Sequence, residues 1–194
     1  MQTFETSALL GSILSVVHPQ LYNTGVEALK ALSKNEHLVF EEGLRDILLL
    51  WSSPFSGYSL ICNRLTPPHR DAQGCTEGFD LLATAGRYIG ARFKLPDIGL
   101  SFDYHSGTVV AILGRVIRHQ VTAHKGDRVV LACYMRDSVL ARLDIPAPPF
   151  MHEREWGDFA NMVAYHEQLE QREAEASVVS ELMNQWINMS QMAT

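Results

Sequence analysis

Three residues that could hold a metal ion are His69 and Asp71, separated by one residue, and His119 much further along the chain. Two imidazoles and one carboxylate on one face of an octahedral Fe(II) ion form a facial triad that leaves three positions open for other ligands. Side chains two residues apart in a strand point to the same side, so His69 and Asp71 can share one strand end. The third ligand must come from a distant strand, and His119 meets that requirement.

The pair His69 and Asp71 is weak evidence by itself, because eight histidines and 22 acidic residues produce such pairs by chance. With Arg70 between them, these residues spell the HRD triplet of a kinase catalytic loop. However, the chain has no glycine-rich phosphate loop, and Thr76 occupies the position of the asparagine in the kinase catalytic loop. A surface turn plus one hydrogen-bonded strand histidine is the structural alternative. The competing ligands are His105 and His124.

A β-rich run at 128–135 opens with Arg128. If open metal positions chelate the 2-oxo acid end of 2-oxoglutarate, the far carboxylate needs a permanently charged, bidentate partner, which arginine supplies better than lysine. Tyr134 and Arg136 lie on the same side of the run, about 20 and 26 Å from Arg128 at roughly 3.3 Å per residue, and we expect them at another part of the cavity. For Tyr134, pocket wall and core are equally compatible with the pattern.

The elements that must position these residues change along the chain. From 3 to 50, apolar residues recur at helical spacing with interruptions at Pro19, Gly25 and Gly43, which predicts two or three helices. From 57 to 143, short runs at 58–62, 99–104, 108–113, 115–121 and 128–135 predict strands without βαβ alternation, and 66–68 predicts a turn. Three prolines at 145–150 predict an extended connector, and a last helix is predicted from about Asp158.

Length and composition indicate one soluble globular domain of the α+β class, 1–194, with 194 residues of which 46% are hydrophobic. We expect a helical buttress at 1–52, a sandwich or jelly-roll core with the metal site at 53–144, and a connector with an acidic helix at 145–194. No segment is apolar enough for a membrane span, and the N-terminus does not resemble a secretory signal. Three cysteines without a CxxC spacing are consistent with a reducing compartment.

Charge is distributed unevenly. Residues 150–194 hold eight acidic and two basic residues, so the rest of the chain is neutral although the whole carries −6. Residues 64–142 include eleven basic and seven acidic side chains, and this excess of positive charge favours binding of a polyanion. For any single basic residue, an ordinary surface charge is the more common interpretation. The candidate phosphate contacts are Arg64, Arg70, Arg87, Arg92, Lys94, Arg115 and Arg118.

The ordered motifs resemble a known family. The segments are NRLTPPHRD at 63–71, SGTVV at 106–110, GRVIRH at 114–119, GDR at 126–128 and YMRD at 134–137. Together they resemble the TET/JBP family of Fe(II)/2-oxoglutarate dioxygenases, and within it the fungal, transposon-associated branch. The resemblance covers 57–142 and implies a double-stranded β-helix (jelly-roll) core.

The resemblance also implies roles. It makes His69, Asp71 and His119 the iron ligands and Arg128 the 2-oxoglutarate anchor, and it places Asn63 where related oxygenases often reach the cosubstrate. Tyr134 falls where TET enzymes stack a tyrosine on the flipped base, and Arg136 where they contact that base. Two residues depart from the pattern: Gly74 replaces an asparagine, and Arg136 replaces a histidine. No zinc is expected.

The activity implied is hydroxylation of 5-methylcytosine in DNA, with Fe(II) as cofactor and with 2-oxoglutarate and O2 consumed to give succinate and CO2. We expect a nuclear or cytoplasmic location, and of the two we prefer the nucleus. The target base would be flipped out of the duplex. The alternatives are an N6-methyladenine or other 2-oxoglutarate hydroxylase, and a non-catalytic jelly-roll module that binds DNA or protein.

Overall fold

The computed structural model describes residues 2–34, 43, 46–48 and 51–151. The chain divides into two compact units, Met1–Phe150 and Met151–Thr194, and all the helices and strands described lie in the first. The helix predicted from about Asp158 lies outside the described residues, and the single-domain organisation stays a prediction. Among the helices described, none has the length and apolar character needed to cross a bilayer.

The chain begins with the helices α1 (Gln2–Val17) and α2 (Pro19–Lys34), and residues 46–48, before the first strand, are also helical. The break at Pro19 is as predicted, because proline fits the first turn of a helix, where its missing N–H costs no hydrogen bond. Gly25, in contrast, does not interrupt a helix but lies inside α2. A Cβ at Gly25 would lie 2.1 Å from the carbonyl oxygen of Pro54, so the glycine lets the segment before the first strand pack directly on α2.

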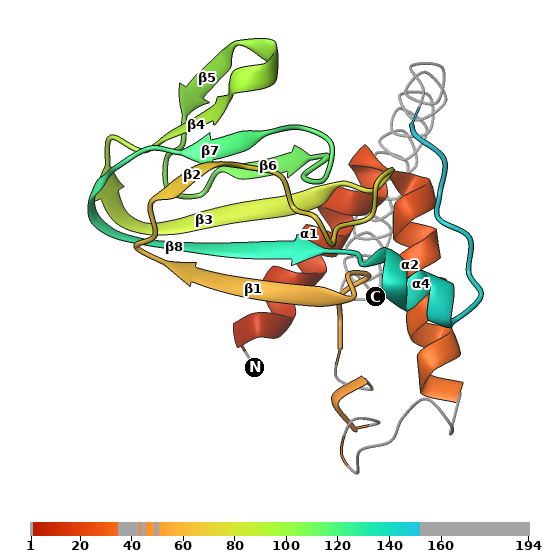
Figure 1. The fold of residues 1–194 in the computed structure, drawn as a ribbon. Coiled ribbons are helices and arrows are strands. Elements are labelled where there is room, and N and C mark those ends of the chain that lie inside the picture. Colours follow the sequence, from red (N-terminus) through yellow and green to blue (C-terminus); the bar gives the residue numbers. More distant parts are fainter. Residues whose placement is uncertain (1, 35–42, 44–45, 49–50, 152–194) are drawn as a thin grey trace, which may run out of the picture. The chain divides into compact units, whose positions relative to one another are not determined.

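Two four-stranded antiparallel sheets form the centre of the unit (Figure 1), with strand orders β1-β8-β3-β6 and β2-β7-β4-β5. This is the predicted α+β fold with a jelly-roll core. The elements are β1 (Gly57–Cys62), β2 (Thr66–His69), β3 (Asp80–Ile89), β4 (Arg92–Leu95), the 3-10 turn η1 (Pro96–Ile98), β5 (Leu100–Asp103), β6 (Val109–Ile112), β7 (His119–Val121), β8 (Lys125–Tyr134) and α4 (Asp137–Arg142).

Several predicted boundaries are wrong. The turn at 66–68 is strand β2, because the two prolines occupy an outer strand of its sheet, where missing N–H groups do not break a central ladder. The strand predicted at 115–121 is limited to β7, which begins at His119, and Arg128 lies inside β8 rather than at its start. Strands β3 and β4 were not predicted.

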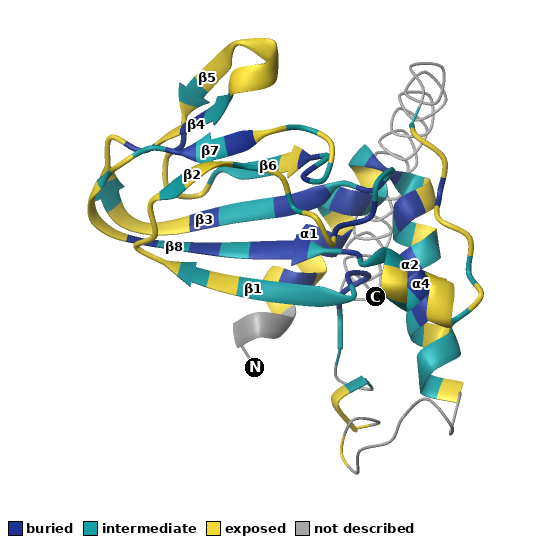
Figure 2. Ribbon diagram, in the orientation of Figure 1, coloured by how far each residue is buried: buried dark blue, intermediate teal, exposed yellow. Residues whose placement is uncertain are grey.

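Buried side chains form two clusters, one on each face of the sheet that contains β8 and β3. Figure 2 shows buried residues along both of these strands and along α1 and α2. The first joins α1 and α2 to this sheet through residues such as Leu14, Leu21, Phe55 and Leu81. The second lies between the two sheets and includes Phe93. The sheet is therefore covered on both faces, and the space between the sheets is where the polar residues of interest gather.

Candidate active site

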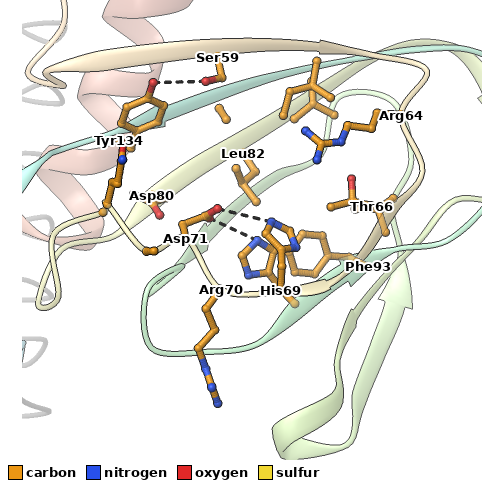
Figure 3. A pocket seen from close by; sticks show the side chains of 18 of the residues that line it. Ser59, Arg64, Thr66, His69, Arg70, Asp71, Asp80, Leu82, Phe93 and Tyr134 are labelled. Carbon is orange, nitrogen blue, oxygen red and sulfur yellow. Dashed lines mark hydrogen bonds and ion pairs between the residues drawn. The ribbon is translucent and has the colours of Figure 1, made fainter.

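The three predicted metal ligands meet. One ligand atom each from His69, Asp71 and His119 lie within 4.8 Å of one another. Nε2 of His69 is 3.4 Å from Oδ1 of Asp71, and Nε2 of His119 is 3.5 Å from Oδ2 of the same carboxylate (Figure 3). Each imidazole thus faces one oxygen of the shared carboxylate, as a common cation would require.

Strand pairing explains the meeting. Strands β2 and β7 run antiparallel with His69 directly opposite His119. Asp71 lies just past β2, where its backbone N–H donates to the carbonyl of Gly114 at 2.9 Å. A Cβ on Gly114 would lie 2.8 Å from Oδ2 of Asp71 and 2.3 Å from Oδ2 of Asp80, so this position has room only for glycine. The glycine allows the carboxylate to approach the two histidines.

The histidine rings are oriented by the backbone. Nδ1 of His69 lies 3.0 Å from the carbonyl oxygen of Pro67, and Nδ1 of His119 lies 3.1 Å from that of Ile117. A proton on Nδ1 satisfies each carbonyl and leaves the Nε2 lone pair facing Asp71, the arrangement usual for metal-binding histidines. Burial is the main cause of a lowered pKa at His119, which also favours the neutral ring. The donor set fits a divalent cation such as Fe(II).

Arg128 is buried, with 1% of its surface exposed. Its Nη2 donates to the carbonyl of Arg64 at 2.9 Å, but Nε and Nη1 are buried with no hydrogen-bond partner among the described residues. The guanidinium carbon lies 5.8 Å from the centre of the Tyr104 ring. A buried guanidinium with two unsatisfied donors needs an acceptor, and the carboxylate at the far end of 2-oxoglutarate would supply one, so the residue fits this role.

One cavity of about 420 Å³ is lined by both Arg128 and the three metal-ligand candidates. Val130 and Ala132 line it as well, next to Arg128 along β8. Tyr134 and Arg136 also lie in its wall, so the expectation that they serve another part of the cavity is compatible with their position. Six of the seven predicted site residues therefore line this cavity, and the seventh, Asn63, does not.

Tyr134 and Arg136 form one wall of that cavity. The guanidinium carbon of Arg136 lies 5.1 Å from the centre of the Tyr134 ring, and Nη1 donates to Oε1 of Gln73. The Tyr134 hydroxyl lies 3.3 Å from Oγ of Ser59, and this hydrogen bond, followed by Arg136, lowers the Tyr134 pKa. A Cβ on Gly57 would meet the Tyr134 ring at 2.7 Å, so β1 supports the ring from behind.

Asn63 has a different place from the one expected. Its Oδ1 accepts the backbone N–H of Arg128 at 2.7 Å, and its Nδ2 donates to Asp127 at 3.1 Å. The residue has a φ of 50°, in the left-handed region that asparagine tolerates. Asn63 is absent from the cavity wall, so it braces the backbone of Arg128 instead of reaching into the cavity.

The competing histidines lie elsewhere. His105 is exposed, 3.9 Å from Asp103, and His124 packs edge-on against the Tyr88 ring at 5.8 Å. Neither belongs to the group around His69.

The cavity contains an acid that the sequence pattern did not reveal, Asp80. It is 4% exposed, and burial, followed by the charge of Asp71, raises its pKa to about 8. Its Oδ2 would lie 3.5 Å from a Cβ at Gly74. The available signal was an aspartate directly before the apolar run 81–83 of β3, where an unpaired charge is unexpected.

Four of the seven predicted phosphate contacts are in ion pairs. Arg70 and Arg118 share Asp97, Arg92 pairs with Asp103, and Arg115 pairs with Asp137. Arg64 lines the cavity. The excess of basic residues is therefore partly neutralised within the unit.

Comparisons with known proteins agree with this geometry. The family model Tet_JBP, described as the oxygenase domain of the 2OGFeDO superfamily, matches residues 1–137. No curated protein matches the chain in sequence. Among solved structures, NgTET1 in complex with 5mC DNA is similar at a TM-score of 0.53 and 14% identity, over 84% of this chain and 56% of that chain. This likeness shows a shared fold, and the chain spans little more than half of that relative.

Proposed function

The chain belongs to the Tet_JBP family, the oxygenase domain of the 2OGFeDO superfamily, and on that premise we propose that it oxidises the methyl group of 5-methylcytosine in DNA. Membership implies Fe(II) and 2-oxoglutarate. The observation that carries the proposal is Arg128, whose two partnerless buried donors share a cavity with His69, Asp71 and His119.

His69, Asp71 and His119 would hold the Fe(II), while Nδ1 of each histidine stays hydrogen-bonded to a backbone carbonyl. When bound, Fe(II), 2-oxoglutarate and O2 supply the oxidant for hydroxylation of a C–H bond, with release of succinate and CO2. Arg128 would bind the cosubstrate's far carboxylate through its guanidinium N–H groups, two of whose nitrogens have no partner among the described residues. Because Tyr104 and the strands around it exclude water there, that ion pair is stronger than it would be in solvent.

Tyr134 and Arg136 would receive the base. A base flipped out of the duplex loses stacking worth a few kcal/mol, and stacking on the Tyr134 ring offsets part of that loss. The guanidinium of Arg136 lies over the same ring and can donate to a base oxygen or ring nitrogen. Support for DNA as the partner comes from NgTET1, a structure solved with 5mC DNA. A DNA substrate in turn favours the nucleus, and the ordered motifs favour the fungal, transposon-associated branch.

N6-methyladenine is the second candidate. It is favoured by Gly74, which adds no side chain at the position where TET enzymes have an asparagine that contacts cytosine. The nearest atoms to a Cβ there lie 3.5 Å away, an ordinary contact distance, so the position could hold a side chain but offers no group that would hydrogen-bond a cytosine.

Succinate formation from 2-oxoglutarate with Fe(II) tests whether the protein is an active dioxygenase. Mass spectrometry of oligonucleotides that carry 5-methylcytosine or N6-methyladenine identifies which base it oxidises. Wild-type protein is expected to hydroxylate the methylated oligonucleotide, and the His69→Ala variant is expected to leave it unchanged. Binding of DNA by the wild type without turnover, unaffected by chelators and by His119→Ala, would instead support the non-catalytic module.

A further inference from the structure

The residue next to each metal-ligand candidate is an arginine. Arg70 lies between His69 and Asp71, and Arg118 directly precedes His119. Neighbouring side chains in extended backbone point to opposite sides, so arginines at these positions point outward when the ligands point inward. Figure 3 shows Arg70 directed away from the Asp71 carboxylate.

Both arginines bind the same carboxylate, Asp97 in η1. Nη2 of Arg70 lies 2.8 Å from Oδ2 of Asp97, and Nη2 of Arg118 lies 2.9 Å from Oδ1. The backbone N–H of Arg118 also donates to Oδ2 at 3.2 Å, and Nε of Arg70 donates to the carbonyl of Val116 at 2.9 Å. The two segments that carry the ligands are therefore tied together through Asp97.

The strands alone hold these segments weakly. The pairing of β2 with β7 consists of Thr66 opposite Val121 and His69 opposite His119, with a register shift between them. Asp71 lies past the end of β2. On the other side, β4 pairs with β7 through Phe93 and Lys94, and η1 directly follows β4, which brings Asp97 beside the residues before His119.

We propose that Asp97 is a positioning residue. By binding both Arg70 and Arg118, it sets how far the segment with His69 and Asp71 lies from the segment with His119. The inference rests on the proposed metal site. The side chain of Asp97 is 28% exposed and those of the arginines are 54% and 49% exposed. Ion pairs this exposed contribute little to global stability, so their loss should leave the unfolding midpoint unchanged. Because they position the ligands, their loss should still lower the affinity for the metal.

A matched control lies on the same hairpin. Asp103 in β5 pairs with Arg92 at 2.6 Å, also at the surface, but Arg92 is next to none of the metal-ligand candidates. Asp97→Asn and Asp103→Asn each remove one charge and one exposed ion-pair network with almost no change in shape. Only the first acts on the segments that carry the ligands.

The experiment is a titration of the metal-free full chain with Mn²⁺ alone, with free Mn²⁺ followed by electron paramagnetic resonance. We expect Asp97→Asn to raise the Mn²⁺ dissociation constant about tenfold, at the lower end of what partners behind the ligands contribute. Asp103→Asn should leave it unchanged, and both variants should keep the urea midpoint of the wild type. Asp97→Glu should recover part of the affinity. Arg70→Met should weaken Mn²⁺ binding in the wild type but add nothing in Asp97→Asn.

Equal dissociation constants for wild type and Asp97→Asn, equal effects of the two asparagine variants, or additive effects of Arg70→Met and Asp97→Asn would each overturn the positioning role. Should Asp97→Asn lower the urea midpoint, Arg118→Met gives the same readout with the carboxylate retained. Wild-type protein that binds no Mn²⁺ would overturn the proposed metal site and this inference with it, whereas tight wild-type binding unaffected by Asp97→Asn would overturn the inference alone.

Discussion

The two ends of the cavity are built in different ways. Arg128 lies in β8, which pairs continuously with β3 on one side and with β1 on the other. The metal-ligand group lies on the short strands β2 and β7 and in the turns next to them, where the Asp71 side chain is 42% exposed. Long ladders fix the cosubstrate end, whereas the metal end depends on individual side-chain bonds.

This difference predicts separable effects. A substitution at the metal end should change metal affinity with little effect on global stability, because it removes few buried contacts. A substitution at the Arg128 end should change cosubstrate affinity and the response of stability to the cosubstrate. A single substitution that changed both ends equally would contradict the comparison.

The largest effect is expected from His69→Ala. Removing one of three ligands should abolish Mn²⁺ binding and reduce succinate formation to background, while the urea midpoint stays near that of the wild type because His69 is partly exposed. His105→Ala is the matched control, since His105 is exposed and outside the ligand group. Turnover retained in His69→Ala would exclude this metal site.

Arg128→Met should act on the cosubstrate alone. Losing one partner of a buried charge pair costs about 2–5 kcal/mol, so the dissociation constant of 2-oxoglutarate should rise roughly 30-fold or more. Because Nε and Nη1 have no partner without ligand, the substitution should not destabilise the ligand-free protein as breaking a satisfied pair would.

Isothermal titration with 2-oxoglutarate and thermal unfolding with and without it measure both effects. The wild-type melting temperature should rise with 2-oxoglutarate, and that of Arg128→Met should not. If Arg128→Met binds 2-oxoglutarate as tightly as the wild type, Arg128 is not the residue that anchors the cosubstrate.

Sequence reasoning brought together residues that share one cavity, but it missed several of the strands that carry them. His69, Asp71, His119 and Arg128 were selected because the proposed chemistry requires particular side chains in a particular order, and whether they act in that chemistry stays a prediction. Strand β3 was missed because its residues, DLLATAGRYI, include alanine, glycine and aspartate, which have low strand propensity. Pairing with β8 and burial on both faces, which are tertiary effects, stabilise this strand.

Residues that act through distant contacts could not be found from spacing. Asp80 becomes a cavity residue only because β3 pairs with β6 and β8. Asn63 was assigned to the cosubstrate from a resemblance, but its side chain bonds the Arg128 backbone through the strand register. Asp97 gave no sequence signal, since nothing near it in the chain resembles a site.

Asp80 lies in the cavity wall beside Asp71, and its titration should appear in the stability of the metal-free protein. Its pKa is raised from 3.8 to about 8. The native state therefore binds more protons between these values, so the contribution to stability is complete below the lower pKa and is lost as pH rises through the higher one. Compared with Asp80→Asn, the wild type should lose a few kcal/mol between roughly pH 4 and 9.

Urea unfolding of both proteins at several pH values gives this difference directly. Parallel stability curves for wild type and Asp80→Asn would show that Asp80 titrates normally. A wild type that loses stability relative to Asp80→Asn as pH falls would have the wrong sign and would indicate a carboxylate stabilised by a cation.

Gly114→Ala should disturb the metal end selectively. The new Cβ would lie 2.8 Å from Oδ2 of Asp71 and 2.3 Å from Oδ2 of Asp80, so at least one carboxylate must move. Overpacking of this kind costs about 1–3 kcal/mol, and we expect weaker Mn²⁺ binding with unchanged 2-oxoglutarate affinity. Gly74→Ala is the control, because its Cβ meets nothing closer than 3.5 Å. Equal Mn²⁺ affinities in the two variants would contradict the steric argument.

The smallest effect is expected from Asn63→Gly, which tests the cosubstrate end. Glycine accepts the φ of 50° without strain, so the variant removes only the bonds to Arg128 and Asp127. One hydrogen bond contributes about 0.5–1.5 kcal/mol, so the 2-oxoglutarate dissociation constant should rise by no more than about tenfold, with Mn²⁺ binding unchanged. Asn63→Ala adds left-handed strain to the same loss and should be less stable than Asn63→Gly. An effect of Asn63→Gly as large as that of Arg128→Met would mean that Asn63 binds the cosubstrate itself.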